Sequence, residues 1–247
     1  MTELIRLWES LSCFVRDNTK ERDDSHGHEH MRRVALNAIM IFEMERSDIC
    51  QQLLTDYVSN YEKFAVNTNS NDFIGFKMDQ ILKNIITVAW LHDVADHKYD
   101  HDGRLLESVK QFIKSNSENN NNSLLTIIRK VSYSEEARFQ KENPNREDDF
   151  ISDLGLQDQI VRNIVSDADK LEALGKIGVD RCIEYSREVL KENGQNVTTE
   201  QINSRVLKHA EEKLLRLKDN YIRTHSGKKI AEKLHEEMVA ELSKLKS

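Results

Sequence analysis

The sequence contains one proline and eight glycines among its 247 residues. An all-β domain of this length needs many tight turns, and proline and glycine are the residues that build them. Their scarcity indicates a chain made mainly of helices. Cysteine is also rare, since Cys13, Cys50 and Cys182 are widely spaced and form no C-x-x-C pair. We therefore expect neither structural disulfides nor a zinc–thiolate site, and a reducing compartment is the simpler environment.

Long hydrophobic runs and an excess of basic residues are absent as well. No segment approaches the ~20 apolar residues of a membrane-spanning helix, and the first residues lack the basic-then-apolar pattern of a signal peptide. The net charge is −7 and the pI about 5.8, which argues against the broad basic surface of a nucleic-acid-binding protein. We expect a soluble cytoplasmic protein with no membrane or nucleic-acid partner. An anionic substrate would be held by a metal ion and a few local Lys or Arg residues.

Apolar residues recur at helical spacing through most of the chain. This spacing predicts helices over residues 3–17, from about 28 with a continuation over 47–64, and over 78–94, 105–113, 124–131, 156–165, 171–190, 199–222 and 228–246. The predicted loops are residues 17–27, 67–72, an Asn-rich insertion at 115–123, a charged stretch at 135–149, and residues 191–197. The segment 78–94 is apolar nearly all round, as a central buried helix should be. We predict an all-α domain over residues 1–195, with a helical hairpin at 196–247 packed on the same domain.

Three separate segments carry side chains that could share one divalent cation. His30 lies in a histidine-rich segment, His92 and Asp93 lie at the end of the predicted central helix, and Asp169 comes just before another predicted helix. Two imidazoles and two carboxylates suit a mixed nitrogen and oxygen site. A buried aspartate needs a partner to offset its desolvation, and a metal ion would serve. If the three segments meet in space, the chain is predicted to be a metal-dependent hydrolase.

The histidines also have a plainer explanation. A His-Asp doublet such as His92-Asp93 arises easily by chance in a chain with nine histidines. The group His26, His28 and His30 could be a polar turn that caps the following helix, or it could supply one metal ligand and one neighbouring imidazole. Neither group is specific when it is taken alone.

The aspartates near these histidines leave the same choice open. Asp167 is best explained as an acceptor for the free N–H groups at a helix start, which makes Asp169 the better ligand candidate. Asp96 follows His92 by four residues and would share its face on a continuous helix, where it could orient a water or take its proton. The alternative for Asp96 is a solvated helix end.

Taken in order, these segments resemble the HD-domain family of metal-dependent phosphohydrolases. The resemblance is carried by the strings SHGHEHMRRV (25–34), LHDVAD (91–96) and DADKLEALG (167–175). The residues around each candidate ligand resemble those of one subgroup of the family, the small stand-alone HD proteins that resemble bacterial nucleotide pyrophosphatases. The resemblance covers about residues 5–190, and Glu172 departs from it because related sequences often carry Asp there.

The resemblance implies a fold and a role for eight residues. The fold would be a single HD-domain helical bundle with a C-terminal helical extension. The metal ligands would be His30, His92, Asp93 and Asp169; Asp96 would be the acid–base or water-orienting carboxylate; Lys98 would act in catalysis and contact phosphate; and His26 and Arg33 would contact substrate.

The expected cofactor is one divalent metal ion. Two imidazoles argue against an all-oxygen magnesium cage, so we expect Mn²⁺, with Mg²⁺, Co²⁺, Ni²⁺, Fe²⁺ or Zn²⁺ as alternatives. The remaining histidines do not fall where a second metal would need them. The expected function is hydrolysis of a (deoxy)nucleoside triphosphate to monophosphate and pyrophosphate, with a small phosphorylated substrate and a monomeric or homodimeric protein. The alternatives are a 5′-nucleotidase-type phosphomonoesterase and a non-catalytic binding protein with the HD fold.

Overall fold

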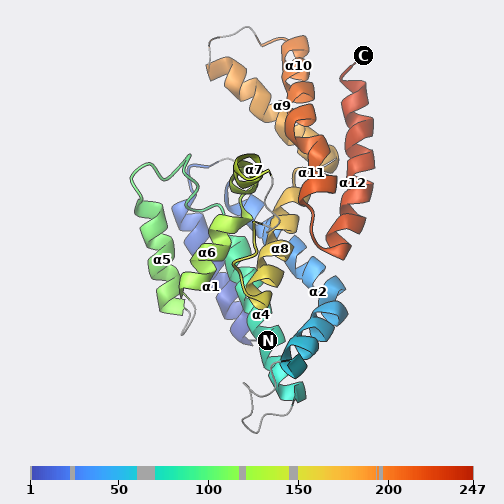
Figure 1. The fold of residues 1–247 in the computed structure, drawn as a ribbon. Coiled ribbons are helices and arrows are strands. Elements are labelled where there is room, and N and C mark those ends of the chain that lie inside the picture. Colours follow the sequence, from blue (N-terminus) through green and yellow to red (C-terminus); the bar gives the residue numbers. More distant parts are fainter. Residues whose placement is uncertain are drawn as a thin grey trace. The chain divides into compact units, whose positions relative to one another are not determined.

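The computed structural model describes residues 2–22, 26–59, 70–116, 121–144, 150–192, 194 and 197–246, and every regular element in these ranges is a helix (Figure 1). The elements are α1 (Thr2–Asn18), α2 (His28–Ser59), α4 (Ser70–Leu91), α5 (Arg104–Asn116), α6 (Asn121–Val131), α7 (Tyr133–Glu142), α8 (Leu156–Leu171), α9 (Gly175–Glu192), α10 (Thr199–His209), the π-helical turn η1 (Ala210–Leu214), α11 (Leu215–Tyr221) and α12 (His225–Lys244). This confirms the all-α prediction.

The chain divides into two compact units, Met1–Val165 and Ser166–Ser247, and α8 crosses the boundary between them. The hairpin predicted at residues 196–247, with a domain boundary at 195, stays a prediction.

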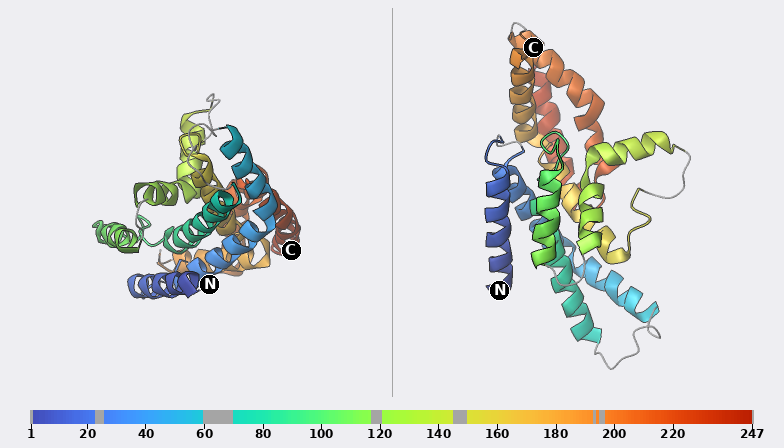
Figure 2. Two further views of the ribbon diagram at one scale, coloured as in Figure 1. Left: turned by 90° about the horizontal axis from the view of Figure 1, so that it is seen from below. Right: turned by 90° about the vertical axis from the view of Figure 1, so that its left-hand side faces the viewer.

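The first unit is built around α4, as the apolar pattern predicts. This helix packs against both α1 and α2, and α6 packs against α4 and α5 (Figures 1 and 2). The last turns of α4 are buried on all sides, because Ile85, Val88, Trp90 and Leu91 are all fully inaccessible to solvent. Trp90 also meets the ring of Trp8 edge-on, with 5.0 Å between the ring centroids. Burial of each large apolar side chain contributes about 1.5–3 kcal/mol, so the end of α4 is a firmly held part of this unit.

The charged stretch predicted as a loop at 135–149 is helical up to Glu142, so that prediction is wrong for α7. Its composition indicated a solvated segment, but Glu136 is fully buried and accepts a hydrogen bond of 2.5 Å from Nη2 of Arg162, which is also fully buried. Nε of Arg162 donates to the carbonyl of Lys130 at 2.7 Å. The partner of Glu136 lies on α8, far along the chain, and no local pattern reveals it. Residues 145–149 lie outside the described residues.

Two other predicted loops are partly helical. Helix α6 begins at Asn121, inside the Asn-rich segment, and α4 begins at Ser70, inside the segment predicted as a loop at 67–72. Residues 117–120 and 67–69 lie outside the described part of the chain, as do residues 60–64 of the predicted continuation of α2. Helix boundaries are the least certain part of a prediction from periodicity, because polar residues are tolerated in the first turn of a helix.

In the second unit, α9 packs against α10 and α12, and α11 packs against α12. The helix predicted over residues 199–222 is interrupted by the π-helical turn η1. A π-helical turn contains about one more residue than an α-helical turn, and the apolar spacing of the sequence does not reveal such a short change. The break predicted at Ser226-Gly227 is wrong, because α12 already begins at His225. Thr224 caps this helix, and its Oγ1 accepts a hydrogen bond of 3.0 Å from the Gly227 N–H.

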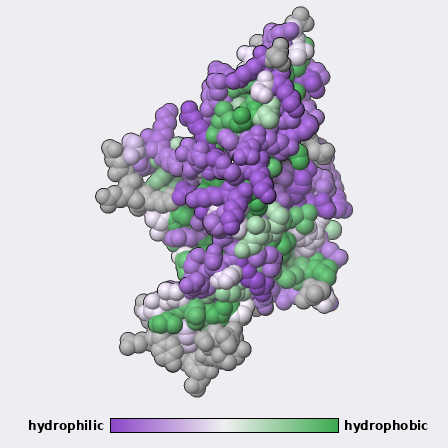
Figure 3. Space-filling view, turned by 90° about the vertical axis from the view of Figure 1, so that its right-hand side faces the viewer, coloured by the Kyte–Doolittle hydropathy of each residue, from purple (hydrophilic) through white to green (hydrophobic). Residues whose placement is uncertain are grey.

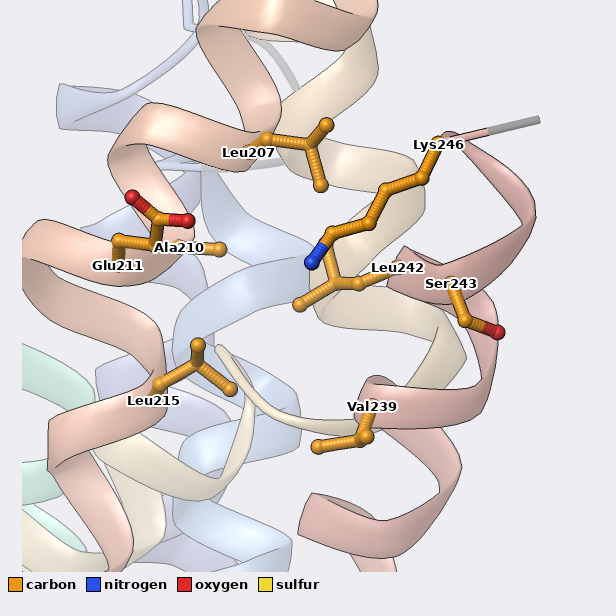
Figure 4. A pocket seen from close by; sticks show the side chains of 8 residues that line it. All are labelled: Leu207, Ala210, Glu211, Leu215, Val239, Leu242, Ser243 and Lys246. Atoms are coloured by element: carbon orange, nitrogen blue, oxygen red, sulfur yellow. The ribbon is translucent and has the colours of Figure 1, made fainter.

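A pocket of about 170 Å³ lies within the second unit (Figure 4). It is lined by Leu207, Ala210, Glu211, Leu215, Val239, Leu242, Ser243 and Lys246. Figure 4 shows apolar side chains from both sides of the pocket pointing toward one another, with the Lys246 ammonium between them. None of the residues singled out in the sequence lines this pocket, so it is separate from the predicted chemistry.

The surface agrees with the polar composition. The mean hydropathy of the sequence is −0.66, and Figure 3 shows a face on which hydrophilic residues predominate and hydrophobic residues form smaller patches. Among the described helices, none combines the length and the apolar character that crossing a bilayer requires.

Candidate metal centre

His30, His92 and Asp93 come together in the first unit. One possible ligand atom from each of the three lies within 4.8 Å of the others. Among the described residues, these three form the cluster of His, Cys, Asp or Glu side chains that is close enough to hold one metal ion. The imidazole rings of His30 and His92 meet edge-on, with 5.4 Å between their centroids. His30 is buried, and the two other side chains are partly exposed. Three of the four predicted ligands are therefore neighbours.

The packing of α2 against α4 brings these three residues together. His30 lies in the first turn of α2. Helix α4 ends at Leu91, so His92 and Asp93 lie in the turn that follows it. The helix predicted over residues 78–94 would place both residues inside the helix, and that part of the prediction is wrong. This turn is stabilised by a hydrogen bond of 3.2 Å from the Val94 N–H to the carbonyl of Leu91. The end of a buried helix thus presents the doublet to the start of α2.

The hydrogen bond of His92 selects one tautomer. Its Nδ1 lies 2.8 Å from the carbonyl oxygen of Ala89, and a carbonyl can only accept, so Nδ1 carries the proton. In the neutral ring the lone pair is then on Nε2, which is a buried atom. A ring that donates one N–H to a carbonyl and offers its other nitrogen is typical of histidine ligands to metals.

The spacing of the three residues fits a single cation. Two ligand atoms that each lie ~2.2 Å from one ion are at most ~4.4 Å apart. The observed limit of 4.8 Å exceeds this value by a few tenths of an ångström, which small side-chain rotations would remove. Imidazole nitrogen and carboxylate oxygen together suit Mn²⁺, Fe²⁺, Co²⁺, Ni²⁺ or Zn²⁺ better than a site made only of oxygen ligands does.

Asp96 and Lys98 lie in the same turn region, but not as a helix would place them. The residues from His92 to Asp96 are not helical, so the expectation that Asp96 shares a helical face with His92 is wrong. Oδ1 of Asp96 accepts a hydrogen bond of 2.8 Å from the backbone N–H of Lys98 and lies 3.3 Å from Nδ1 of His97. Lys98 is exposed. The catalytic roles of Asp96 and Lys98 stay predictions.

The histidine-rich segment separates into residues with different surroundings. His26 lies near the triad, with its ring centroid 6.4 Å from that of His30 and 6.0 Å from that of Tyr99. His28 lies instead against α1, where its Nε2 is 2.9 Å from Oγ of Ser12. Arg33, on α2, is partly exposed. The substrate contacts expected of His26 and Arg33 stay predictions.

Asp167 and Asp169 lie in the last turns of α8, within the second unit, and not ahead of a helix as predicted. Asp167 does accept backbone N–H groups at a helix start, but the helix is α12: it accepts from the N–H groups of Arg223 at 2.9 Å and Thr224 at 2.7 Å. Burial raises the pKa of the Asp167 carboxyl, and these hydrogen bonds oppose that effect. Asp169 as the fourth ligand stays a prediction.

Arg22 contacts the turn of the doublet, and sequence reasoning gave it no role. Its two terminal nitrogens donate to the carbonyls of Asp93, at 2.8 Å, and Val94, at 2.5 Å. Its guanidinium carbon lies 4.1 Å from the centroid of the Tyr99 ring. No motif in the sequence marks Arg22, because its partners are backbone carbonyls and one ring, which any sequence could offer.

Comparison with known proteins gives similarity at the level of structure. No protein-family model and no curated protein matches the sequence. Bacillus subtilis YpgQ is 22% identical, over 99% of this chain and 96% of its own, with a TM-score of 0.60. YpgQ in complex with ADP is 21% identical, over 99% of this chain and 95% of its own, with the same TM-score of 0.60. An HD-superfamily hydrolase from Bacillus thuringiensis is 22% identical, over 98% of this chain and 95% of its own, with a TM-score of 0.58.

At these identities the similarity shows the fold. The chain has the fold of an HD-superfamily hydrolase over nearly its whole length. This confirms the HD-domain helical architecture that the sequence motifs predict.

Proposed function

We propose that this chain is a metal-dependent phosphohydrolase that acts on nucleotides. The observation that carries the proposal is the triad of His30, His92 and Asp93, which an HD-type helical fold brings to within 4.8 Å. One of the two histidines is also held in the tautomer that a metal ligand needs, which supports a metal-binding site.

In this proposal, His30, His92 and Asp93 hold one divalent cation, and Asp169 supplies the fourth ligand. A bound cation supplies a Lewis acid, which neutralises charge on a phosphate oxygen and makes a water easier to deprotonate. Mn²⁺ is the cation that we expect, because it accepts both imidazole and carboxylate ligands and suits phosphate chemistry.

The remaining residues would handle the proton and the phosphate charge. Asp96 would orient the attacking water and take its proton, since a carboxylate beside the reacting water can act as a general base. Lys98, which is exposed and two residues further on, would contact a phosphate oxygen. His26, whose ring lies 6.4 Å from that of His30, and Arg33 would contact the substrate.

We propose a (deoxy)nucleoside triphosphate as the substrate. YpgQ, which has a similar fold, has been crystallised with ADP, and this supports a nucleotide ligand. Water would add to the α-phosphorus and the bond between the α-phosphorus and the bridging oxygen would break, which yields a monophosphate and pyrophosphate.

A panel of nucleotides tests the proposal. Purified protein, first stripped with EDTA, is incubated with nucleoside triphosphates and monophosphates in the presence of Mn²⁺, Mg²⁺, Co²⁺ or Ni²⁺, and the products are separated by ion-exchange chromatography. We expect pyrophosphate from the triphosphates. Free phosphate from the monophosphates would indicate a phosphomonoesterase instead, and no turnover with bound metal would indicate a binding protein.

Three substitutions connect the activity to the site. His92→Ala and Asp93→Ala should each abolish turnover and remove bound Mn²⁺. His101→Ala is the matched control, because this histidine is exposed and lies outside the triad. If His92→Ala and Asp93→Ala both keep the metal and the activity, the assignment of the site is wrong.

A further inference from the structure

Arg22 joins two parts of the first unit that are far apart in the sequence. It lies in the turn that follows α1, where its backbone N–H donates to the carbonyl of Thr19 at 3.1 Å. Thr19 is buried and its hydroxyl donates to the carbonyl of Val15 at 2.8 Å. The base of the Arg22 side chain is thus anchored to the end of α1, while its guanidinium reaches the turn after α4.

The guanidinium contacts that turn at three places. One terminal nitrogen donates to the carbonyl of Asp93 and the other to the carbonyl of Val94. The guanidinium carbon lies over the ring of Tyr99, at 4.1 Å from the centroid. The Tyr99 N–H donates to the carbonyl of Asp96 at 2.9 Å, so the ring belongs to the same turn. Two hydrogen bonds and a ring contact together restrict both the position and the orientation of a guanidinium.

The turn needs such support because it is not helical. Asp93 and Val94 lie beyond the last residue of α4, so the hydrogen-bond ladder of that helix does not reach their carbonyls. The Asp93 carbonyl accepts from the Asp96 N–H at 3.2 Å, and Arg22 supplies a further donor to each of the two carbonyls. A basic side chain just past the end of a helix is also favourable against the helix dipole. Asp93, one member of the triad, has its backbone carbonyl held directly by Arg22. A shift of this carbonyl would rotate the Asp93 side chain and so change the distances between the three possible ligands.

The charge of Arg22 is also matched to its surroundings. Burial lowers the pKa of Arg22, and the nearby acidic groups of Asp93, Asp96 and Asp100 act in the opposite direction. An arginine starts from so high a value that its guanidinium stays charged. Its positive charge therefore lies near the negative charges of these three carboxylates.

We propose that Arg22 is a positioning residue for the metal centre, which holds the turn of His92 and Asp93 in the geometry that the cation needs. This inference rests on the proposed function, since it assumes that the triad binds a cation. Arg22 itself touches neither the cation nor the substrate in this proposal. Partners that orient metal ligands typically change metal affinity or activity by about 10–100-fold when they are lost.

The test uses the full-length protein and Mn²⁺ alone as the probe. Arg22→Met keeps most of the side-chain length but removes the charge and both donor nitrogens. Arg22→Lys keeps the charge but replaces the two terminal nitrogens of the guanidinium with a single ammonium group. The matched control is Arg104→Met, because the Arg104 side chain is 87% exposed and pairs with Asp102 outside the triad. Mn²⁺ affinity is measured by titration calorimetry on metal-free protein, and unfolding by urea is followed in the same samples.

We expect Arg22→Met to weaken Mn²⁺ binding by about 10–100-fold, Arg22→Lys by less, and Arg104→Met not at all. The Mn²⁺ concentration needed for half-maximal hydrolysis should rise in parallel, and excess Mn²⁺ should restore part of the rate. If both Arg22 variants fold and bind Mn²⁺ as tightly as the wild type, the inference is overturned, even where their stability falls. If Arg22→Met does not fold, the Mn²⁺ affinity of Arg22→Lys alone tests the inference: weaker binding than in the wild type supports it, and equal binding overturns it.

The wild-type measurements separate this inference from the proposed function. Wild-type protein that binds Mn²⁺ but hydrolyses no nucleotide would overturn the proposed function, while the affinities of the variants would still decide the role of Arg22. Wild-type protein that binds no Mn²⁺ would overturn both.

Discussion

Oε2 of Glu136 and Nη2 of Arg162 lie 2.5 Å apart, and both side chains are fully buried. The two residues belong to α7 and α8, and the guanidinium also donates to the carbonyl of Lys130. Transfer of two charges out of water is costly, and only their mutual attraction and further hydrogen bonds offset it. The pair therefore stabilises the first unit only while both members are present.

Loss of one partner should be far more harmful than loss of an exposed ion pair. Glu136→Ala leaves a buried guanidinium without its counter-charge, so we expect the free energy of unfolding to fall by about 3–5 kcal/mol. Glu135→Ala, on the same helix, removes an exposed pair with Arg138 and should cost less than about 1 kcal/mol. Urea denaturation of the two variants gives the comparison, and equal losses would show that the buried pair has no special role.

This pair illustrates which part of the fold the sequence can predict. The apolar spacing that predicts α4 depends on neighbours within the same helix, and the structure confirms a helix whose last turns are buried on all sides. Glu136 is buried instead against Arg162, which lies on another helix. Local composition therefore gives a loop, and only the three-dimensional packing reveals α7.

Gly227 lies where a larger residue would not fit. A Cβ at this position would lie 2.6 Å from Oδ2 of Asp167 and 2.6 Å from Oγ1 of Thr224. Both oxygens are held in place, since Oδ2 accepts from the N–H and the hydroxyl of Thr224 at 2.7 Å each. Gly227→Ala should therefore lower the free energy of unfolding by about 1–3 kcal/mol.

Gly75→Ala is the matched control for that substitution. Gly75 is also helical, but a Cβ there would have no neighbour within 4 Å. It should stabilise the protein by about 0.5–1 kcal/mol through helix propensity alone. Thermal or urea unfolding distinguishes the two, and a destabilisation of equal size at both positions would contradict the role of Asp167 and Thr224.

The thiol of Cys182 should ionise at a higher pH than an exposed cysteine thiol does. Burial raises its pKa, and a hydrogen bond with the side chain of Ser186 opposes this only in part. A raised pKa means a smaller fraction of the reactive thiolate at a given pH, so the rate of alkylation should rise with a midpoint above the usual ~8.5. In a protein with Cys13→Ser and Cys50→Ser, iodoacetamide labelling between pH 7 and 10 measures this midpoint. In urea the midpoint should return to about 8.5, and an identical profile in folded and unfolded protein would refute the prediction.

The grouping of three residues could be predicted from the sequence, but Arg22 could not. His30, His92 and Asp93 could be selected from the order of their segments and the residues around them, since neither histidine group is specific when it is taken alone; the structure places the three together, and their role as metal ligands stays a prediction. Arg22 could not be selected, because a donor to backbone carbonyls requires no particular residue type in its partner. Asp167 was predicted to accept N–H groups at the start of the helix that follows it, but it accepts instead from Arg223 and Thr224, far along the chain and just before α12.

His28 and His30 are two residues apart in α2, yet they should behave differently. His28 contacts Oγ of Ser12, and its ring lies 5.2 Å from that of Trp90, so it joins α1, α2 and α4. His28→Ala should keep bound Mn²⁺ and lower the free energy of unfolding by about 1 kcal/mol. His30→Ala should lose the metal. Metal content by mass spectrometry, measured beside urea unfolding, tests both, and metal loss in His28→Ala would contradict the assignment.

Asp169→Asn tests the proposal that Asp169 is a metal ligand. An amide oxygen carries no charge and binds a divalent cation more weakly than a carboxylate does. Since even residues that only orient a ligand cost about 10–100-fold in metal affinity, loss of a ligand charge should cost at least about as much. Asp167→Asn, on the same helix, should unfold more easily while it keeps the wild-type affinity for Mn²⁺, because Asp167 is occupied by the start of α12. Calorimetric titration of both variants separates the two roles. Wild-type affinity in Asp169→Asn would mean that the first unit holds the cation without a carboxylate from α8.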